Sequence, residues 1–388
     1  MVIGLSGGVD SSVAAALLIE QGHEVIAMFM RNWNDESVTI NNECPWIDDS
    51  NDALLAAQHL GIPYQVVDLS VEYKACIVDY MFGEYSAGRT PNPDVLCNRE
   101  IKFDVFLKHA LALGADYVAT GHYCQKKTIE VDGVEHHQLV AGADKNKDQS
   151  YFLCQITEEQ LSKIIFPIGH LQKSSVREIA TKLNLPNAAK KDSQGLCFIG
   201  KVRLPDFLAQ QIALREGEVI ELPNHLPAFD QKRQSKELEE ICSAYKFSPA
   251  DGKVIGKHMG VHAYTIGQRR GLKIGGNEIP LFVVALDAKK NIVYVAKGED
   301  HPALNRLGFM ILKKDMHWMQ NEDTMKDGEV RTYQMRMRYR QALETAHIHY
   351  LSGDYVYILF DQYSKGIAPG QFAVWYDGDV LVGSGVIS

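Results

Sequence analysis

The sequence predicts an α/β protein in which a doubly wound parallel-sheet domain comes first, a small central domain follows, and an antiparallel β-barrel ends the chain. From Met1 to about Gly200, short and continuously apolar runs alternate with helical patterns, which is typical of parallel strands covered on both faces. A polar, charge-rich stretch then interrupts this alternation. From Pro280 onward the chain contains only strand-like runs separated by turn residues, which favours a small barrel.

The alternation is clearest at the start of the chain. Residues 1–5 and 23–30 are predicted as strands, and residues 11–21 between them as a helix that Gly22 closes. The pattern continues as helix 48–61, strand 62–70, helix 99–114, strand 115–123, and a hairpin over 124–143 that turns at Asp132–Gly133. Ligands of such sheets bind beyond the carboxyl ends of the strands. We therefore expect the site where Ser6–Ser11, Met30 and Gly121–His122 fall.

The rest of the chain suggests the domain boundaries 1–202, 203–299 and 300–388. Within the second domain, Leu226–Gly252 is interpreted as an insertion with one helix that serves docking or solubility. Predicted strands follow at 280–287, 291–298, 329–341, 354–361 and 371–378. In the third of these, Arg336, Arg338 and Arg340 alternate with apolar residues, so one strand face would be cationic and suited to RNA phosphates.

Composition excludes several classes of protein. The chain has 388 residues, a formal net charge of −9 and seven cysteines. The cysteines are scattered without any C-x-x-C pair, which argues against a disulfide framework and a structural zinc site. The longest apolar run near the amino terminus, Val13–Ile19, is far shorter than a membrane span. We expect a cytoplasmic protein with no membrane partner.

The loop after the first strand, "SGGVDSS", predicts a phosphate site. Glycine-rich loops that enter a helix direct backbone N–H groups at anions. This loop lacks the lysine of a Walker motif and the spacing of a dinucleotide fingerprint. Ser6, Gly7, Gly8 and Ser11 are left to cradle a pyrophosphate, with Asp10 placed to hold Mg²⁺. The plain alternative is a serine-capped helix after a glycine turn.

This loop resembles the signature of the N-type ATP pyrophosphatases, which cleave ATP between its α- and β-phosphates and adenylate a substrate oxygen. Within that group, the chain resembles the tRNA-specific 2-thiouridylases. The further motifs that carry this resemblance are "GRTPNPDVLCNREIKF", "ATGHY", "NKDQSYFL", "KKDSQGLCFIG", "YTIGQRRGL" and "RYRQ". They cover nearly the whole chain. Two departures are Gln194, in place of a small hydroxyl residue, and the length of Leu226–Gly252.

The resemblance implies a function and a set of site residues. It implies ATP-dependent 2-thiolation of a tRNA uridine, at the wobble position, with ATP and Mg²⁺ as cofactors and with tRNA and a persulfide sulfur-donor or relay protein as partners. The implied ATP contacts are Gly4, Leu5, Ser6, Gly7, Gly8, Val9, Asp10, Ser11, Met30 and Gly121. The implied contacts with tRNA are Asn92, Pro93, Asp94, His122, Lys147, Asp148, Gln149, Arg338, Tyr339 and Gln371. Cys97 and Cys197 are the implied catalytic cysteines.

The chemistry of the residues agrees with these roles. Replacing a uracil oxygen by sulfur needs an activated oxygen and a soft nucleophile, and a persulfide needs a second thiol to release its sulfur. Cys97 and Cys197 lie in Gly/Pro-rich loops, and we expect Cys97 just before a helix start at Asn98, where its thiolate is favoured. Both should meet over the ATP crevice. Asp94 is either a general acid/base or an ordinary turn residue.

Other readings stay open at this stage. Another tRNA-modifying or amide-forming ligase of the same ATP pyrophosphatase group would share the loop but would need no cysteine pair. A non-catalytic tRNA-binding protein would bind RNA without consuming ATP. Cys76 and Cys154 are interpreted as packing residues, and Cys44 is left undecided.

Overall fold

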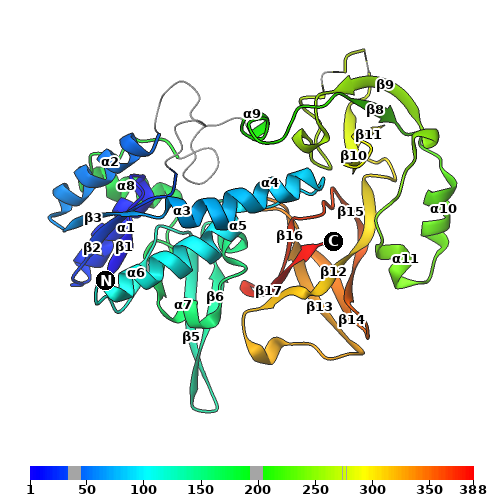
Figure 1. Cartoon of the computed structure of the whole chain (residues 1–388). Coiled ribbons are helices and arrows are strands. Elements are labelled where there is room, and N and C mark those ends of the chain that lie inside the picture. Colours follow the sequence, from blue (N-terminus) through cyan, green and yellow to red (C-terminus); the bar gives the residue numbers. More distant parts are fainter. Residues whose placement is uncertain (34–44, 193–203, 273, 277) are drawn as a thin grey trace.

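The protein consists of a helix-covered parallel sheet, a small central sheet and a closed barrel. The computed structural model describes residues 1–33, 45–192, 204–272, 274–276 and 278–388. Figure 1 shows the parallel sheet and its helices on one side of the molecule, and the central sheet and the barrel on the other. The mixed α/β architecture expected from the sequence is confirmed.

The amino-terminal sheet has the order β3-β2-β1-β4-β7, with every pair parallel. Its strands are β1 (Val2–Gly4), β2 (Ile26–Arg31), β3 (Tyr64–Asp68), β4 (Val118–Ala119) and β7 (Ile164–Ile165). The chain adds strands outward from β1 in one direction and then, from β4 on, in the other. A crevice opens at such a reversal, beyond the carboxyl ends of the two central strands. The predicted doubly wound sheet is therefore present.

Two groups of helices cover this sheet. One face packs against α1 (Val9–Glu20), α2 (Pro45–Leu60) and α8 (Lys173–Lys182). The other packs against two long helical stretches that contain α3 (Ser70–Tyr73), α4 (Asp79–Ser86), α5 (Pro93–Leu96) and α6 (Phe106–Ala112), with π-helical turns at Lys74–Val78 and Cys97–Val105. The predicted glycine ends at Gly22, Gly61 and Gly114 all have positive φ. The helices at 70–86 and 173–182 were not predicted from the sequence.

A hairpin joins the amino-terminal domain to the barrel. It contains β5 (Cys124–Val131) and β6 (Val134–Ala141). It turns at Asp132 and Gly133, both with positive φ, as predicted. Val140 of β6 pairs with Val380, so the hairpin extends the barrel sheet, and it projects from the molecule in Figure 1. Short helices follow at Ser150–Leu153 and α7 (Glu158–Ser162).

The carboxyl-terminal strands form the expected barrel. Its strand order is β12-β15-β14-β13-β16-β17, and β12 also pairs with β17, which closes the ring. The strands are β12 (Asn305–Trp318), β13 (Glu329–Arg336), β14 (Glu344–Tyr350), β15 (Tyr355–Lys365), β16 (Phe372–Asp377) and β17 (Val380–Ile387). Closure leaves its interior to buried side chains such as Trp375 and Phe309.

The central domain is built on a separate sheet of order β10-β11-β8-β9. Its elements are β8 (Gly217–Glu221), α10 (Pro227–Gln234), α11 (Leu238–Cys242), β9 (Lys253–His258), β10 (Leu281–Asp287) and β11 (Ile292–Lys297). The predicted strands at 280–287 and 291–298 thus exist, but they pair here and not in the barrel. Before this sheet, α9 (Leu204–Leu208) inserts Phe207 into the amino-terminal core.

The segment Leu226–Gly252 packs into the core of the central domain. Phe229 is 2% exposed and lies 5.2 Å from Tyr245 and 5.6 Å from His301, measured between ring centroids. Cys242 is buried, and its thiol donates to the Ile358 carbonyl of the barrel at 3.4 Å. The side chains of this segment therefore complete the central core and contact the barrel, so the segment has a packing role in addition to the docking or solubility role predicted for it.

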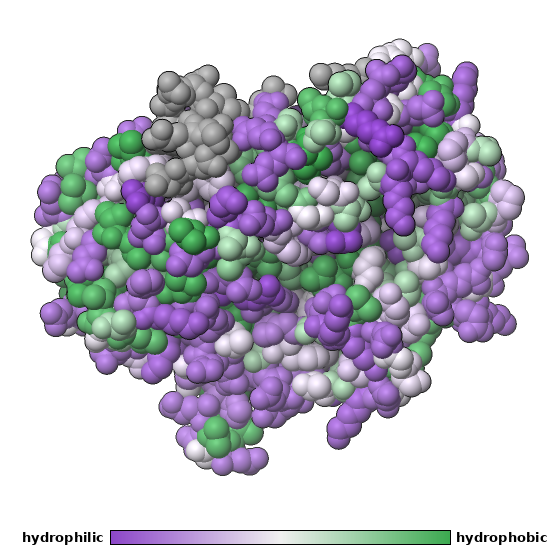
Figure 2. Space-filling model, in the orientation of Figure 1, coloured by the Kyte–Doolittle hydropathy of each residue, from purple (hydrophilic) through white to green (hydrophobic). Residues whose placement is uncertain are grey.

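The barrel and the amino-terminal domain share one apolar core. Phe372, Val374 and Leu381 of the barrel belong to the same buried cluster as Phe103 and Tyr151. On the face drawn in Figure 2, hydrophilic and hydrophobic side chains are interspersed. In the part of the chain that the structure describes, no helix is both long and apolar enough to span a membrane.

Replacing Phe229 by alanine is expected to lower the free energy of unfolding by about 3–5 kcal/mol, because it leaves a cavity among aromatic rings. Urea unfolding followed by tryptophan fluorescence measures this. Lys236→Ala, at an exposed position of the same segment, is the matched control and should change little. Equal stability of the two variants would contradict the structural role of the segment.

Candidate functional site

The loop after β1 forms the floor of the crevice. Gly7 has φ +75°, and a Cβ there would lie 2.2 Å from the Asp49 carbonyl oxygen. Gly8 is extended, and no side chain caps the helix α1 that starts after it. The Ser11 hydroxyl lies 3.2 Å from both the backbone nitrogen and the hydroxyl of Ser6. The loop therefore presents the positive end of α1 to the crevice without the protein's own side chain occupying it.

Gly121 fixes this loop against the next strand. It follows β4, and a Cβ at Gly121 would lie 2.7 Å from the Ser11 backbone nitrogen and 2.9 Å from the Asp10 carbonyl carbon. Only glycine allows the two backbones to approach this closely. The loop and Gly121 were both predicted on one site, and the structure brings them into direct contact. Met30, at the end of β2, is buried beside Gly4.

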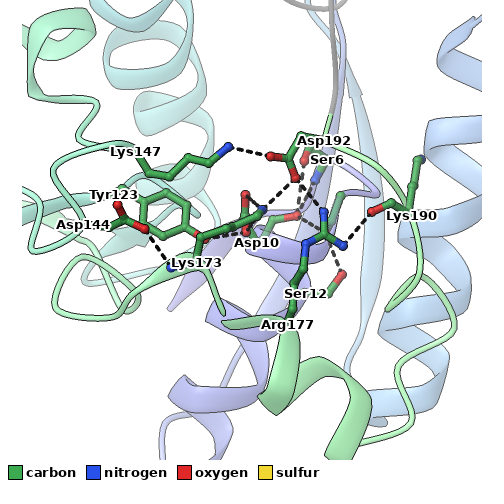
Figure 3. Close-up of polar contacts among 12 residues, drawn as sticks. Ser6, Asp10, Ser12, Tyr123, Asp144, Lys147, Lys173, Arg177, Lys190 and Asp192 are labelled. Atoms are coloured by element: carbon green, nitrogen blue, oxygen red, sulfur yellow. Dashed lines mark hydrogen bonds and ion pairs between the residues drawn. The ribbon is translucent and has the colours of Figure 1, made fainter. Parts of the chain in front are cut away.

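Asp10 carries the negative charge at the centre of the site (Figure 3). Its carboxylate accepts a hydrogen bond from the Tyr123 hydroxyl at 2.8 Å and bonds from Lys173 Nζ at 2.7 and 2.9 Å. Burial, together with the Asp10 charge, raises the pKa of Tyr123, which keeps the phenol protonated as a donor. Lys173 is the first residue of α8, so two different elements hold one carboxylate of the phosphate loop.

A second carboxylate, Asp192, gathers three cations. It lies 2.7 Å from Lys147 Nζ, 2.9 Å from Lys173 Nζ and 2.8 Å from Arg177 Nη2. Partial burial alone would raise the pKa of Asp192, but the bonds from Lys147 and Lys173 hold that pKa below its usual range. Figure 3 shows these side chains converging beside the loop. The positive charge of this cluster suits a polyphosphate, and in the structure the Asp192 carboxylate is the anion that the three cations bind.

Further contacts brace the loop from behind. Lys190 Nζ lies 2.7 Å from Asp49 Oδ1 and 2.5 Å from Asp52 Oδ2. Asn187 donates to the Gly7 carbonyl at 3.0 Å and to the Ser12 hydroxyl at 2.9 Å. Both carboxylates belong to α2, so Lys190 ties that helix to the segment that follows α8.

The residues fit Mg²⁺ only as a companion of ATP. Within the described ranges, no three His, Cys, Asp or Glu side chains converge as metal ligands. Asp10 offers one carboxylate, and both its oxygens accept hydrogen bonds from Lys173. Mg²⁺ usually takes one or two carboxylates and completes its shell with substrate phosphates and water. The donor set of this site matches that mode and not a preformed cage.

Cys97 lies within a helix and not before one. Asn92 is the N-cap, its side chain accepts from the Val95 nitrogen at 3.3 Å, and Pro93 is the first helical residue. The expected helix start at Asn98 is therefore wrong, because the Asn92–Pro93 pair begins the helix five residues earlier. Cys97 is 0% exposed, whereas Cys76, interpreted as a packing residue, is exposed. Asp94 lies in the first turn of that helix, half-buried.

Cys197, Gln194 and Cys44 lie outside the described residues. The predicted approach of Cys97 to Cys197 over the ATP crevice is likewise untested and stays a prediction.

Four of the predicted tRNA contacts lie close to the ATP loop. Gln149 Oε1 accepts from the Tyr123 nitrogen at 3.0 Å, and Lys147 binds Asp192. Asp148 is buried and its carboxylate faces Ser150 and the barrel. His122 is buried next to Phe103, and burial, with a contribution from Lys102, holds its pKa well below the usual range. Their roles with tRNA stay predictions.

The remaining predicted tRNA contacts lie where the barrel meets the amino-terminal domain. Gln371 Nε2 donates to the Thr90 and Pro91 carbonyls at 2.8 and 3.2 Å, beside the Asn92–Asp94 turn. Arg338 Nη2 donates to the Ile266 and Gly366 carbonyls. The Tyr339 hydroxyl lies 3.4 Å from the Lys147 carbonyl. Gln371 and Tyr339 therefore contact the amino-terminal domain, and Arg338 contacts the central domain and the barrel.

The predicted cationic strand face is wrong. β13 ends at Arg336, so Arg338 and Arg340 do not continue its alternation. Arg336 points inward, with its side chain 10% exposed, and it pairs with Asp148 at 2.7 Å. The alternation with methionines suggested a solvated face, but Asp148, nearly two hundred residues earlier, supplies a buried counter-charge that no local pattern shows.

Sequence reasoning also missed Lys173, Arg177 and Asp192. Asp192 stands within the quoted "KKDSQGLCFIG" motif, which was the one available signal. Lys173 and Arg177 lie four residues apart on the unpredicted helix α8, so they face the same side.

Comparisons with known proteins agree with this site. Family models match the "tRNA methyl transferase HUP domain" at residues 1–201, the "tRNA methyl transferase PRC-barrel domain" at 243–297 and the "Aminomethyltransferase beta-barrel domain" at 310–387. The tRNA-specific 2-thiouridylase MnmA of Flavobacterium johnsoniae is 56% identical over 393 residues, which cover 100% of this chain and 99% of that protein. The enzyme of the same name from Christiangramia forsetii is 55% identical with the same coverage.

More distant relatives share the full length too. The Bacillus subtilis tRNA-specific 2-thiouridylase MnmA is 43% identical over 387 residues, 100% of this chain and 94% of its own. A solved NMN synthetase from Francisella tularensis is only remotely similar, with 20% identity and a TM-score of 0.31 over 50% of this chain and 65% of that one.

Gly121→Ala is expected to weaken ATP binding roughly tenfold or more, since a displacement that costs about 1.4 kcal/mol suffices for that change. The added methyl group would push the first turn of α1 away from β4. Isothermal titration calorimetry with ATP measures the affinity. Gly83→Ala in α4, where a Cβ meets nothing within 4 Å, should bind ATP as the parent does, and equal affinities in all three proteins would contradict the close approach.

Proposed function

The chain belongs to the tRNA-specific 2-thiouridylase family, and we propose that it replaces O2 of a tRNA uridine, at the wobble position, by sulfur at the expense of ATP. One observation carries this proposal for the site. The SGGVDSS loop, its helix end and the three cations around Asp192 lie together at the switch point of the sheet and are suited to bind a polyphosphate.

The first step assigned to the site is activation of the uracil oxygen. When bound, ATP supplies the adenylyl group that turns O2 into a leaving group. The amides at the start of α1 and the side chains of Lys147, Lys173 and Arg177 are placed to hold the phosphates and to stabilise the departing pyrophosphate. Phosphates entering the cluster would replace Asp192 as the partner of these cations.

Asp10 serves this step because its negative charge can be compensated either by Lys173 or by Mg²⁺. In the structure its carboxylate is held by Lys173 and Tyr123. With ATP present, Asp10 would offer one oxygen to Mg²⁺, while Lys173 turns to the phosphates. Both arrangements keep the carboxylate compensated, which a half-buried charge requires.

The second step brings sulfur to the activated carbon. Cys97 lies one helical turn from Asn92–Asp94, and Gln371 donates to the carbonyls of the two residues that precede this turn, Thr90 and Pro91. The uridine must leave its stack to reach this buried region. In this position Asp94 is suited to move a proton at the base.

Sulfur transfer is proposed to proceed through a persulfide on Cys197. Its terminal sulfur bonds to C2, the C2–O2 bond breaks, and AMP leaves with the oxygen. Cys97 then attacks the Cys197 sulfur, so the two cysteines form a disulfide while 2-thiouridine is released. A thiol reductant must return both cysteines to thiols, and a persulfide-carrying protein must reload Cys197. These needs fit a reducing compartment such as the cytoplasm.

Mass spectrometry of tRNA nucleosides tests the function. Unmodified tRNA incubated with the protein, ATP, Mg²⁺ and a persulfide source should yield 2-thiouridine, with pyrophosphate released in step. Asp10→Ala should abolish pyrophosphate release while tRNA binding persists, because Asp10 contacts only the nucleotide site. Cys97→Ser should bind ATP and tRNA but form no thiolated product.

Cys76→Ser is the control for the cysteine variant, because Cys76 is exposed and lies outside the proposed chemistry. It should thiolate as the parent does. Full thiolation by Cys97→Ser would reject the two-cysteine mechanism, and unchanged pyrophosphate release by Asp10→Ala would reject the role given to the loop.

A further inference from the structure

A single short segment connects the ATP site with the barrel. We call Asp144–Ser150 the bridging segment. It follows the hairpin β5–β6, and most of its residues contact either the phosphate-loop side or the barrel side through hydrogen bonds that its own side chains make. None of the roles discussed so far requires one segment to contact both domains in this way.

On the barrel side, the contact is a buried ion pair. Arg336 Nη2 lies 2.7 Å from Asp148 Oδ2, and it also contacts the Ser150 and Tyr376 hydroxyls at 3.1 and 2.7 Å. The side chains of Arg336 and Asp148 are 10% and 6% exposed. The other Asp148 oxygen accepts from the backbone nitrogens of Gly142 and Ser150. The barrel thereby fixes the backbone of the bridging segment and not merely one side chain.

On the ATP side, three contacts run from the same segment to the charged cluster. Gln149 accepts from the Tyr123 nitrogen, and the Tyr123 hydroxyl donates to Asp10. Lys147 binds Asp192. Asp144 Oδ2 accepts from the backbone nitrogen of Lys173 at 3.0 Å, which places a carboxylate at the first turn of α8. A shift of the bridging segment would therefore move side chains that bind the carboxylates of Asp10 and Asp192.

We propose that Arg336 is a positioning residue through which the barrel sets the geometry of the ATP site. Asp148 accepts the hydrogen bond from Arg336, which fixes the position of the bridging segment. That position in turn sets the side chains that bind Asp10 and Asp192. The barrel also contacts the segment through the Tyr339 hydroxyl and the Lys147 carbonyl, next to the surface assigned to tRNA. Binding of tRNA there and binding of ATP at the loop are then coupled, and each must raise the affinity of the other by the same factor.

The physical basis is the cost of leaving either charge alone. A buried ion pair adds little stability relative to apolar residues, but breaking it strands a charge out of water. The Arg336 guanidinium donates hydrogen bonds in several fixed directions, a fork that can form only in one placement of the barrel against the bridging segment. The position of the barrel that preserves this fork is thus strongly preferred. The same position places Lys147 beside Asp192 and Gln149 beside the Tyr123 nitrogen.

The test measures the coupling directly and rests on the proposed function. The dissociation constant of α,β-methylene-ATP, which cannot release pyrophosphate, is measured by calorimetry with and without saturating tRNA. In the parent protein we expect tRNA to tighten binding roughly fivefold or more, within the usual range for coupled sites. The double variant Arg336→Met/Asp148→Asn removes both charges together and should bring the ratio of the two constants close to one.

Two further variants make the result specific. Ser384→Ala removes a buried contact between the barrel and Gln155 that does not touch the bridging segment, and it should keep the parental ratio. Arg336→Lys keeps the charge but not the fork, so its ratio should fall between those of the parent and the double variant, whether or not the double variant folds.

The outcomes separate the two proposals. A parent protein that does not bind the analogue would overturn the proposed function. A parent that binds it with a ratio of one, or an Arg336→Lys variant with the full parental ratio, would overturn the coupling alone. A loss of ratio in Ser384→Ala equal to that in the double variant would also overturn it, because general loosening of the interface would then explain both.

Discussion

The contact between the Gly121 backbone and the first turn of α1 is the constraint on which the site depends. It joins the phosphate loop after β1 to the strand on the other side of the switch point, at separations that leave no room for a side chain. Tyr123 lies just beyond Gly121, after His122, and its hydroxyl donates a hydrogen bond to Asp10. The backbone contact therefore fixes the positive end of α1 against the crevice between the strands, and the Tyr123 hydroxyl holds the Asp10 carboxylate beside it.

Around this rigid centre, lysine and arginine side chains are paired with carboxylates that bound phosphates could replace. Lys173 binds two carboxylates, Asp10 and Asp192, at nearly equal distances, and Lys147 and Arg177 also end on Asp192. A cluster of cations without anions would repel itself and destabilise the fold. The carboxylates compensate the cations in the structure, and under the proposed function phosphates would take their place, so that the same cations would face the charge that develops during nucleotide cleavage. Preorganised charge of this kind lowers a barrier without reorganisation cost.

The sequence predicted the parts of this arrangement that are local and missed the parts that are not. The loop, its glycines, the Asp132–Gly133 turn and most strands could be predicted because their conformations depend on residues next to one another. The position of Cys97 was misjudged because the helix begins at the Asn92–Pro93 pair and not at Asn98, where the sequence offered only a weaker start signal. Arg336 was misjudged because its partner Asp148 is distant in sequence, and the packing role of Leu226–Gly252 was missed because a polar surface pattern conceals Phe229.

The central claim is that this site uses ATP to activate the uracil oxygen, and the fate of that oxygen tests it most directly. A tRNA substrate labelled with ¹⁸O at O2 of the target uridine is converted in a single turnover, and the AMP is analysed by mass spectrometry. Activation by adenylation predicts that AMP carries one ¹⁸O and that pyrophosphate carries none. Thiolated tRNA accompanied by unlabelled AMP would contradict the account, because the oxygen would then have left by another route.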